Sequence, residues 1–168
     1  MTGAQLELLP GACPAPTGTG DQWATPPALF EALDREFGPF VLDAAALPGN
    51  AKCARFWTPA ENGLAQPWGP GPTWCNPPYS DPGPWCRKAV AEARAGNLSV
   101  LLLKSDTGTT WFQDDVAGQA EVIFLRPRVR FVGAPAQAPF PSLLAVYRPG
   151  LDLPLSPWRC WNWKEARL

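Results

Sequence analysis

The tetrapeptide Asn76-Pro77-Pro78-Tyr79 brings two hydrogen-bond acceptors and an aromatic ring together within four residues. The side chain of Asn76 offers an amide oxygen, and the carbonyl of Pro77 offers a second acceptor on a backbone that both prolines stiffen. Tyr79 adds a flat face on which a base can stack, an interaction worth about 1–3 kcal/mol per base. These residue types are suited to holding an amino group that is attached to a planar ring.

The 168 residues include no histidine, and the net charge is −1. Mechanisms that use a histidine base are therefore excluded, so the chemistry must use Asn, Asp, Glu, Lys, Tyr or Cys. The near-neutral charge argues against a strongly basic nucleic-acid binder, although local basic patches can still attract DNA. The five cysteines are an odd set without a C-x-x-C pair, which predicts reduced thiols in a cytoplasm and no metal site.

The elements that must position the motif can be read from the hydrophobic pattern. The pattern predicts helices over residues 26–37, 84–95 and 111–117, and buried strands over residues 40–43, 73–75, 98–103 and 121–125. Strands that alternate with helices predict an α/β fold with a mostly parallel sheet. Residues 129–132 and 142–147 are expected to add a terminal antiparallel pair. Residues 1–20, rich in Pro and Gly, are expected to be a flexible lead-in to a single domain over residues 21–168.

Three of the predicted parallel strands end in polar residues, at Asp43, at Asn76 and at Lys104-Ser105-Asp106. The carboxyl ends of parallel strands meet at one edge of a sheet, which is where such folds bind ligands. We therefore expect these residues to lie around one crevice. No apolar run is long enough to span a membrane, and no signal peptide is recognisable, so no membrane partner is expected.

Several short motifs occur in a specific order around the tetrapeptide. They are Asp21-Gln22-Trp23-Ala24-Thr25-Pro26, Phe40-Val41-Leu42-Asp43-Ala44-Ala45-Ala46, Asn50-Ala51-Lys52-Cys53, Gly63-Leu64 with Trp68, Asn76-Pro77-Pro78-Tyr79-Ser80, and Trp85. Together they resemble the phage-type DNA N6-adenine methyltransferase (Dam) family over about residues 21–147. The resemblance implies a single-domain Rossmann-like class I methyltransferase fold, S-adenosyl-L-methionine as cofactor, and methylation of adenine N6 in DNA.

By this resemblance Asn76, Pro77, Pro78 and Tyr79 are the catalytic residues, acting without a strong base on an adenine that is rotated out of the duplex. The cofactor-binding residues it implies are Trp23, Thr25, Pro26, Asp43, Ala44, Asn62 and Asn76. Two features depart from the wider class. The strand that ends at Asp43 lacks a Gly-x-Gly turn, and Asn62, beside Glu61, stands where the family usually has an acid. Whether Glu61 or Asn62 meets the cofactor stays open, and Trp23 could instead only pack the first helix.

DNA contacts are expected at Ser80, Lys104, Arg126, Arg128 and Arg130. The three arginines recur at every second residue, so they share one face if the segment is extended; the alternative is a charged sheet edge. For Lys104 the alternative is a solvated strand end. The segment from Trp158 to Lys164 mixes aromatic and basic residues and is expected to be a hydrophobic strap over the sheet rather than a surface for single strands.

Other functions fit the same tetrapeptide. A site with two acceptors serves any planar amino group, so cytosine N4 in DNA and a glutamine amide in a protein are alternative targets, and a catalytically idle DNA-binding or anti-restriction module is a third. No separate recognition domain is expected within this length. The target sequence is therefore expected to be short or relaxed and to be read by loops such as 107–112 and 133–141. The protein is expected to act in the cytoplasm as a monomer or weak homodimer.

Overall fold

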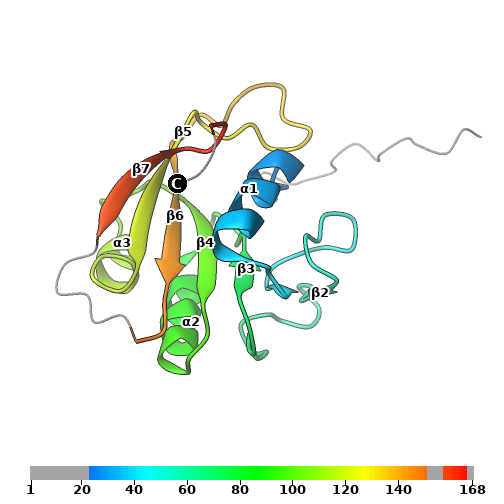
Figure 1. The fold of residues 1–168 in the computed structure, drawn as a ribbon, viewed down its shortest axis with the longest axis vertical. Coiled ribbons are helices and arrows are strands. Elements are labelled where there is room, and N and C mark those ends of the chain that lie inside the picture. The colour runs from blue at the N-terminus through cyan, green and yellow to red at the C-terminus, as the bar shows by residue number, and fades with distance from the viewer. Residues whose placement is uncertain (1–22, 151–156, 166–168) are drawn as a thin grey trace, which may run out of the picture.

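The computed structural model describes residues 23–150 and 157–165. The predicted lead-in of residues 1–20 and the first two residues of the Asp21 motif lie outside this part of the chain. The described elements are, in chain order, α1 (Pro27–Phe37), β1 (Leu42–Asp43), β2 (Arg55–Phe56), β3 (Thr73–Cys75), α2 (Gly83–Arg94), β4 (Ser99–Lys104), α3 (Thr110–Asp115), β5 (Glu121–Arg126), β6 (Ser142–Tyr147) and β7 (Trp158–Asn162). Figure 1 shows their arrangement.

The strands form one seven-stranded sheet in the order β2-β1-β3-β4-β6-β5-β7. The neighbours from β2 to β4 are parallel, β6 is antiparallel to both β4 and β5, and β7 is parallel to β5. Six of these strands thus run in one direction and only β6 runs against them. The predicted α/β fold with a mostly parallel sheet is confirmed.

Helices cover both faces of this sheet. Alternate residues of β4 point to opposite faces, so Val100 and Leu102 pack with Leu33 of α1, whereas Leu101 and Leu103 pack with α2. Each face buries its own apolar cluster, with Leu29, Leu33 and Phe37 of α1 on one side and Cys86, Ala89 and Ala93 of α2 on the other. None of the described helices is both long enough and apolar enough to cross a membrane.

The end of α1 fixes where β1 begins. Gly38 N–H donates to the Asp34 carbonyl, and the Asp34 carboxylate accepts from Phe40 N–H at 2.7 Å. A side chain at Gly38 would overlap the Asp34 carbonyl oxygen, so the chain needs a glycine at this close approach. This turn leads directly into β1 and places Asp43 at the strand's carboxyl end.

The expected antiparallel pair of residues 129–132 with 142–147 is wrong. Residues 142–147 form β6, but both edges of β6 are occupied by β4 and β5, so no free edge is left for residues 129–132. Those residues instead start an irregular segment between β5 and β6, gold at the top of Figure 1, which reaches the start of α1 through the 3.0 Å bond from Val132 N–H to the Ala24 carbonyl.

The Trp-rich segment is also not a strap across a face of the sheet. Residues 158–162 form β7, an edge strand that continues the sheet beyond β5, with Phe124 opposite Cys160. The prediction failed because the first three residues of β7 are exposed, so the segment lacks the alternation of buried and exposed residues that marks a strand. The two-residue strand β2 was not predicted at all.

Candidate active site

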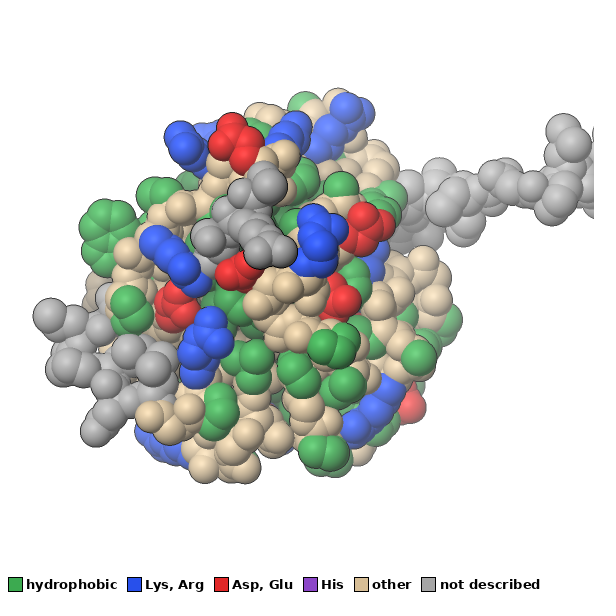
Figure 2. All heavy atoms as spheres, viewed as in Figure 1, with side chains coloured by type: hydrophobic (Ala, Val, Ile, Leu, Met, Phe, Trp, Pro, Cys, Tyr) green, Lys and Arg blue, Asp and Glu red, His purple; other side chains and the backbone are tan. Residues whose placement is uncertain are grey.

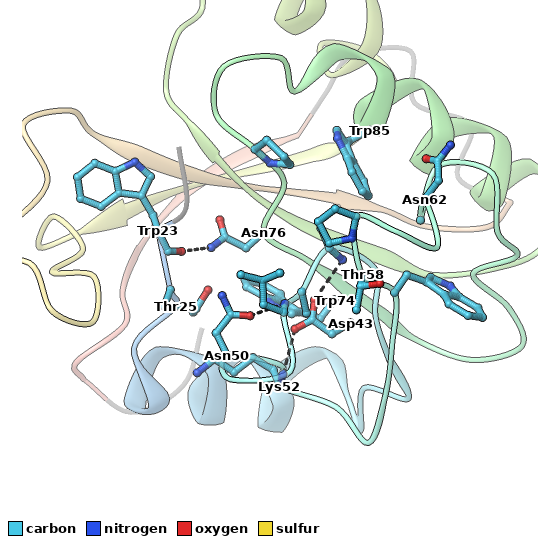
Figure 3. A pocket seen from close by; sticks show the side chains of 18 residues that line it. Trp23, Thr25, Asp43, Asn50, Lys52, Thr58, Asn62, Trp74, Asn76 and Trp85 are labelled. Carbon is cyan, nitrogen blue, oxygen red and sulfur yellow. Dashed lines mark hydrogen bonds between the residues drawn. The ribbon is translucent and has the colours of Figure 1, made fainter. Parts of the chain in front are cut away.

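A pocket opens at the carboxyl edge of the sheet, where β1 and β3 end beside the segment that precedes α1. Its empty volume is about 780 Å³, a figure that includes open solvent at the mouth. In Figure 3, Trp23 and Asn76 lie toward one end of the pocket and Trp85 and Asn62 toward the other, with Asp43 and Trp74 between them. The predicted crevice therefore exists, and Asp43 and Asn76 both line it, whereas the third expected group, Lys104-Ser105-Asp106, is not part of its wall.

Asn76 has one side-chain atom satisfied and one free. Its amide nitrogen Nδ2 donates to the carbonyl oxygen of Trp23 (Figure 3), and its amide oxygen Oδ1 is buried without a hydrogen-bond partner among the described residues. A buried acceptor without a partner costs about 1–3 kcal/mol, so such atoms are rare and need an explanation. An N–H group of a ligand in the pocket would satisfy this oxygen.

The rest of the tetrapeptide divides between the pocket and the core. Pro78 lines the pocket, whereas Pro77 is buried and Tyr79 is only 6% exposed, and neither of them lines it. The Tyr79 ring meets Phe131 and Phe140 edge to face, at centroid distances of 6.0 and 5.6 Å. Burial raises the pKa of Tyr79, and its hydroxyl has no partner among the described residues. The ring is thus covered in this structure, and base stacking on it stays a prediction.

The Asp43 carboxylate lies on the pocket wall and is only 3% exposed. It accepts hydrogen bonds from the backbone N–H groups of Lys52, at 3.0 Å, and Ala45, at 3.4 Å. Burial raises the pKa of Asp43 to about 6, although both hydrogen bonds act in the opposite direction. Burial also lowers the pKa of Lys52. A carboxylate held in this way is suited to binding a cationic amino group.

The segment before α1 supplies two of the predicted cofactor residues. Thr25 lines the pocket and is 2% exposed. Trp23 also lines it, while its ring packs on Phe131 at 5.2 Å and on Phe140 at 6.0 Å, so one residue both packs and lines the pocket, and its contact with a cofactor stays a prediction. Pro26 precedes the helix and is not part of the pocket wall. Ala44 is fully buried and also absent from the wall, where Ala45 takes its place.

Of Glu61 and Asn62, only Asn62 lines the pocket wall. The Glu61 carboxylate accepts from the backbone N–H and the hydroxyl of Thr58, at 2.9 and 2.8 Å, which lowers its pKa. Asn62 lines the pocket and has a φ of 57°, in the left-handed region that Asn tolerates better than most residues. Glu61 therefore shapes the turn that presents Asn62.

Aromatic residues that the sequence did not single out as ligands form much of the remaining wall, namely Trp57, Trp74 and Trp85. Trp85 stacks on the buried Trp68, with ring centroids 6.2 Å apart. Gly63 lies between this wall and β1: a Cβ built there would overlap the Ala44 carbonyl oxygen and lie 3.3 Å from Trp57 and Trp85. The sequence did contain a signal for this aromatic wall, because Gly63, Trp68 and Trp85 belong to the short motifs. Residue type alone, however, could not distinguish aromatic residues that pack in the core from those that line the pocket.

The predicted DNA-contacting residues lie at the same edge of the sheet but outside the pocket. Lys104 ends β4 and Arg126 ends β5. The Lys104 ammonium lies 4.9 Å from the Phe140 ring centre and 5.5 Å from that of Tyr79, so it borders the tetrapeptide. Arg128 and Arg130 follow in the irregular segment, where their guanidinium groups donate to the Pro139 and Ala134 carbonyls, at 3.2 and 3.1 Å.

The three arginines and Ser80 are exposed, and Lys104 is half-buried. No ion pair of the described ranges uses these lysine and arginine side chains. Figure 2 shows Lys and Arg side chains gathered along the upper edge of this view, the edge over which the segment between β5 and β6 passes in Figure 1. The described residues hold no group of three or more Cys, Asp or Glu that could bind a metal ion.

Comparison with known proteins gives consistent results. The model of the family described as DNA N-6-adenine-methyltransferase (Dam) matches residues 13–143. A DNA N-6-adenine-methyltransferase of Escherichia phage T1 is 34% identical over 111 residues, which are 66% of this chain and 47% of that protein. One of Haemophilus phage HP1 is 32% identical over 137 residues, 77% of this chain and 79% of that protein. The chain thus spans about half the length of the T1 relative and most of the HP1 relative, and it belongs to the DNA N-6-adenine-methyltransferase (Dam) family.

Proposed function

We propose that this chain transfers a methyl group from S-adenosyl-L-methionine to the N6 amino group of adenine in DNA. The observation that carries the proposal is the buried Oδ1 atom of Asn76, which has no hydrogen-bond partner among the described residues and belongs to a side chain in the pocket wall. The motif order and the two phage relatives, which are named for this activity, support it. We assign residues 21–168 to a single Rossmann-like class I methyltransferase domain that acts in the host cytoplasm as a monomer or weak homodimer.

The pocket residues fit the proposed cofactor chemically. Asp43 offers a buried carboxylate to the cofactor's amino group, and Thr25 offers a hydroxyl to its carboxylate. Asn62 and the indole rings of Trp57 and Trp85 offer polar and aromatic contacts to its adenine ring. When bound, S-adenosyl-L-methionine supplies an activated methyl group.

The reaction requires a more nucleophilic amino nitrogen on the target base. The N6 lone pair of adenine is delocalised into the ring, so the free base is a poor nucleophile. Asn76 Oδ1 and the Pro77 carbonyl would accept the two N6 hydrogens, which favours a tetrahedral nitrogen and stabilises the positive charge that develops on it. This arrangement needs no strong base, in agreement with a chain without histidine.

The target base must leave the duplex to reach Asn76, at a cost of a few kcal/mol. Stacking on an aromatic face offsets part of this cost. Because Phe131 and Phe140 of the segment between β5 and β6 cover the Tyr79 ring in this structure, we propose that this segment moves when DNA binds. Lys104, Arg126, Arg128 and Arg130 are then assigned to contacts with the phosphate backbone. Reading of a short or relaxed target is assigned to residues 133–141 and to residues 107–112, which are not the expected loop throughout because α3 begins at Thr110.

The proposal is tested by incubating the protein with unmethylated DNA and S-adenosyl-L-methionine that carries an isotope-labelled methyl group, followed by nucleoside analysis. We expect the label in N6-methyladenine. Label in N4-methylcytosine, or in protein instead of DNA, would assign a different amino acceptor. Asn76→Ala is expected to abolish transfer while binding of the cofactor, measured by calorimetry, is kept. Transfer at the wild-type rate by this variant would contradict the assigned role of Asn76.

A further inference from the structure

The hydrogen bond between Asn76 and Trp23 limits which side chains can occupy position 76. The Trp23 partner is a main-chain carbonyl oxygen, which can only accept a hydrogen bond. The atom that faces it must therefore be a donor, so the amide nitrogen of Asn76 points to Trp23 and Oδ1 is directed elsewhere (Figure 3). The two orientations of the Asn76 amide are not equivalent at this site.

The Trp23 carbonyl is held in place by contacts that do not involve Asn76. The Trp23 ring lies 5.2 Å from Phe131 and 6.0 Å from Phe140, and the next carbonyl along the chain, that of Ala24, accepts from Val132 N–H at 3.0 Å. On its other side, the segment leads into the buried Thr25 and helix α1. The segment can thus orient Asn76, rather than being oriented by it.

We infer that the carbonyl of Trp23 is a positioning group that accepts only a hydrogen-bond donor from the side chain of residue 76. This chain therefore requires Asn at position 76 and does not function with an ionised Asp there. An ionised carboxyl has two acceptor oxygens and no donor. One of them would face the Trp23 carbonyl in a buried environment, where unpaired acceptors and charges are costly. A protonated carboxyl has an O–H and restores the missing donor.

Charged and titratable groups from other elements surround this position. Asp43 of β1 and Lys52 of the following loop line the same pocket, and Tyr79 and Lys104 border the tetrapeptide. Asp43 disfavours a second negative charge nearby, whereas the two lysines favour it. The inference requires that the facing carbonyl and burial disfavour the ionised carboxyl at position 76 by more than the two lysines favour it. The experiment measures this balance.

The first of two tests is the pH dependence of methyl transfer by Asn76→Asp. This test rests on the proposed function, whereas the second test does not. Rates are measured on unmethylated DNA at saturating cofactor and divided by the wild-type rate at each pH, which removes pH effects that the two proteins share. At about pH 8 we expect a loss of about 100-fold, the size of effect seen when one preorganised polar contact is lost. The ratio should rise at least about 10-fold toward pH 5.5, as the new carboxyl takes up a proton.

Asn76→Ala is the matched control, because its side chain has neither a donor nor a charge, and its transfer activity should stay abolished at every pH. An Asn76→Asp rate near the wild-type rate at about pH 8, or a ratio that is flat or falls toward acidic pH, would overturn the inference.

A second measurement does not depend on activity and keeps the inference testable if the wild-type protein methylates nothing. The free energy of unfolding of Asn76→Asp is compared with that of Asn76→Ala between about pH 4 and pH 8. If the Trp23 carbonyl disfavours the ionised carboxyl, the folded-state pKa of the new group lies above its unfolded value. The Asp variant must then lose stability relative to the Ala variant as pH rises through that folded pKa. If the free energy of unfolding of the Asp variant, relative to that of the Ala variant, stays constant or rises with pH, the inference is rejected.

Discussion

The carboxylate of Asp43 accepts a hydrogen bond from the backbone N–H of Lys52, nine residues further along the chain, at 3.0 Å. This bond closes the loop between β1 and β2 against the pocket. It also holds a buried carboxyl whose pKa is raised from 3.8 to about 6 by desolvation. The ionisation of Asp43 should therefore affect both the stability of the free protein and its affinity for a cationic ligand, in opposite directions.

The first prediction is the pH dependence of stability. Because the folded-state pKa of Asp43 lies above the unfolded value, the contribution of its protonated form is fully present below about pH 3.8 and is lost as pH rises through about 6. A shift of this size corresponds to about 3 kcal/mol between the two limits. Chemical unfolding of the wild type and of Asp43→Ala across this window measures it, and the variant should lack this part of the pH dependence.

The second prediction concerns the cofactor at the same carboxylate. If Asp43 binds the amino group of S-adenosyl-L-methionine, its ionised form is required, so the affinity should fall as pH drops through about 6. Calorimetry at several pH values provides the measurement. In Asp43→Ala the affinity should be low at all of them. A wild-type affinity that does not change across this window would place the cofactor's amino group away from Asp43.

The positions of the polar residues at the edge of the sheet could be predicted from the sequence because they depend on short-range signals. Apolar runs that end at Asp43, Asn76 and Lys104 indicate buried strands, and parallel strands must bring those ends to one edge. The burial of Tyr79 could not be predicted in this way. It depends on Phe131 and Phe140, whose segment has no regular structure and packs by long-range contacts.

The third prediction separates the two roles of Tyr79. Tyr79→Phe keeps the ring contacts and removes a buried hydroxyl that has no partner among the described residues, so the stability should stay equal or rise by up to about 1 kcal/mol. Tyr79→Ala removes the ring from the core, which should cost about 3–5 kcal/mol, and should also lower turnover strongly. Unfolding free energies and transfer rates are measured for both variants. A large loss of turnover in Tyr79→Phe would instead assign the hydroxyl a part in the reaction.

The fourth prediction tests the close approach at Gly63. A Cβ at this position would overlap the Ala44 carbonyl oxygen and press on Trp57 and Trp85, so Gly63→Ala must displace either β1 or the aromatic wall. We expect a loss of about 1–3 kcal/mol in stability and weaker cofactor binding. Gly49→Ala is the matched control, since a Cβ there meets nothing within 4 Å. Equal behaviour of the two variants would show that the pocket does not depend on this contact.

The fifth prediction assigns DNA binding to the carboxyl edge of the sheet. Arg126 is exposed at the end of β5, and its replacement in Arg126→Gln should weaken DNA binding and reduce the slope of log affinity against log salt by about 1, with the cofactor affinity kept. Arg94→Gln is the matched control. This exposed arginine ends α2 just before β4 begins, so it lies toward the opposite edge of the sheet, and its loss should leave the salt slope unchanged. If Arg94→Gln reduces the slope and Arg126→Gln does not, DNA approaches the amino edge, and the pocket at Asn76 cannot receive a base from it.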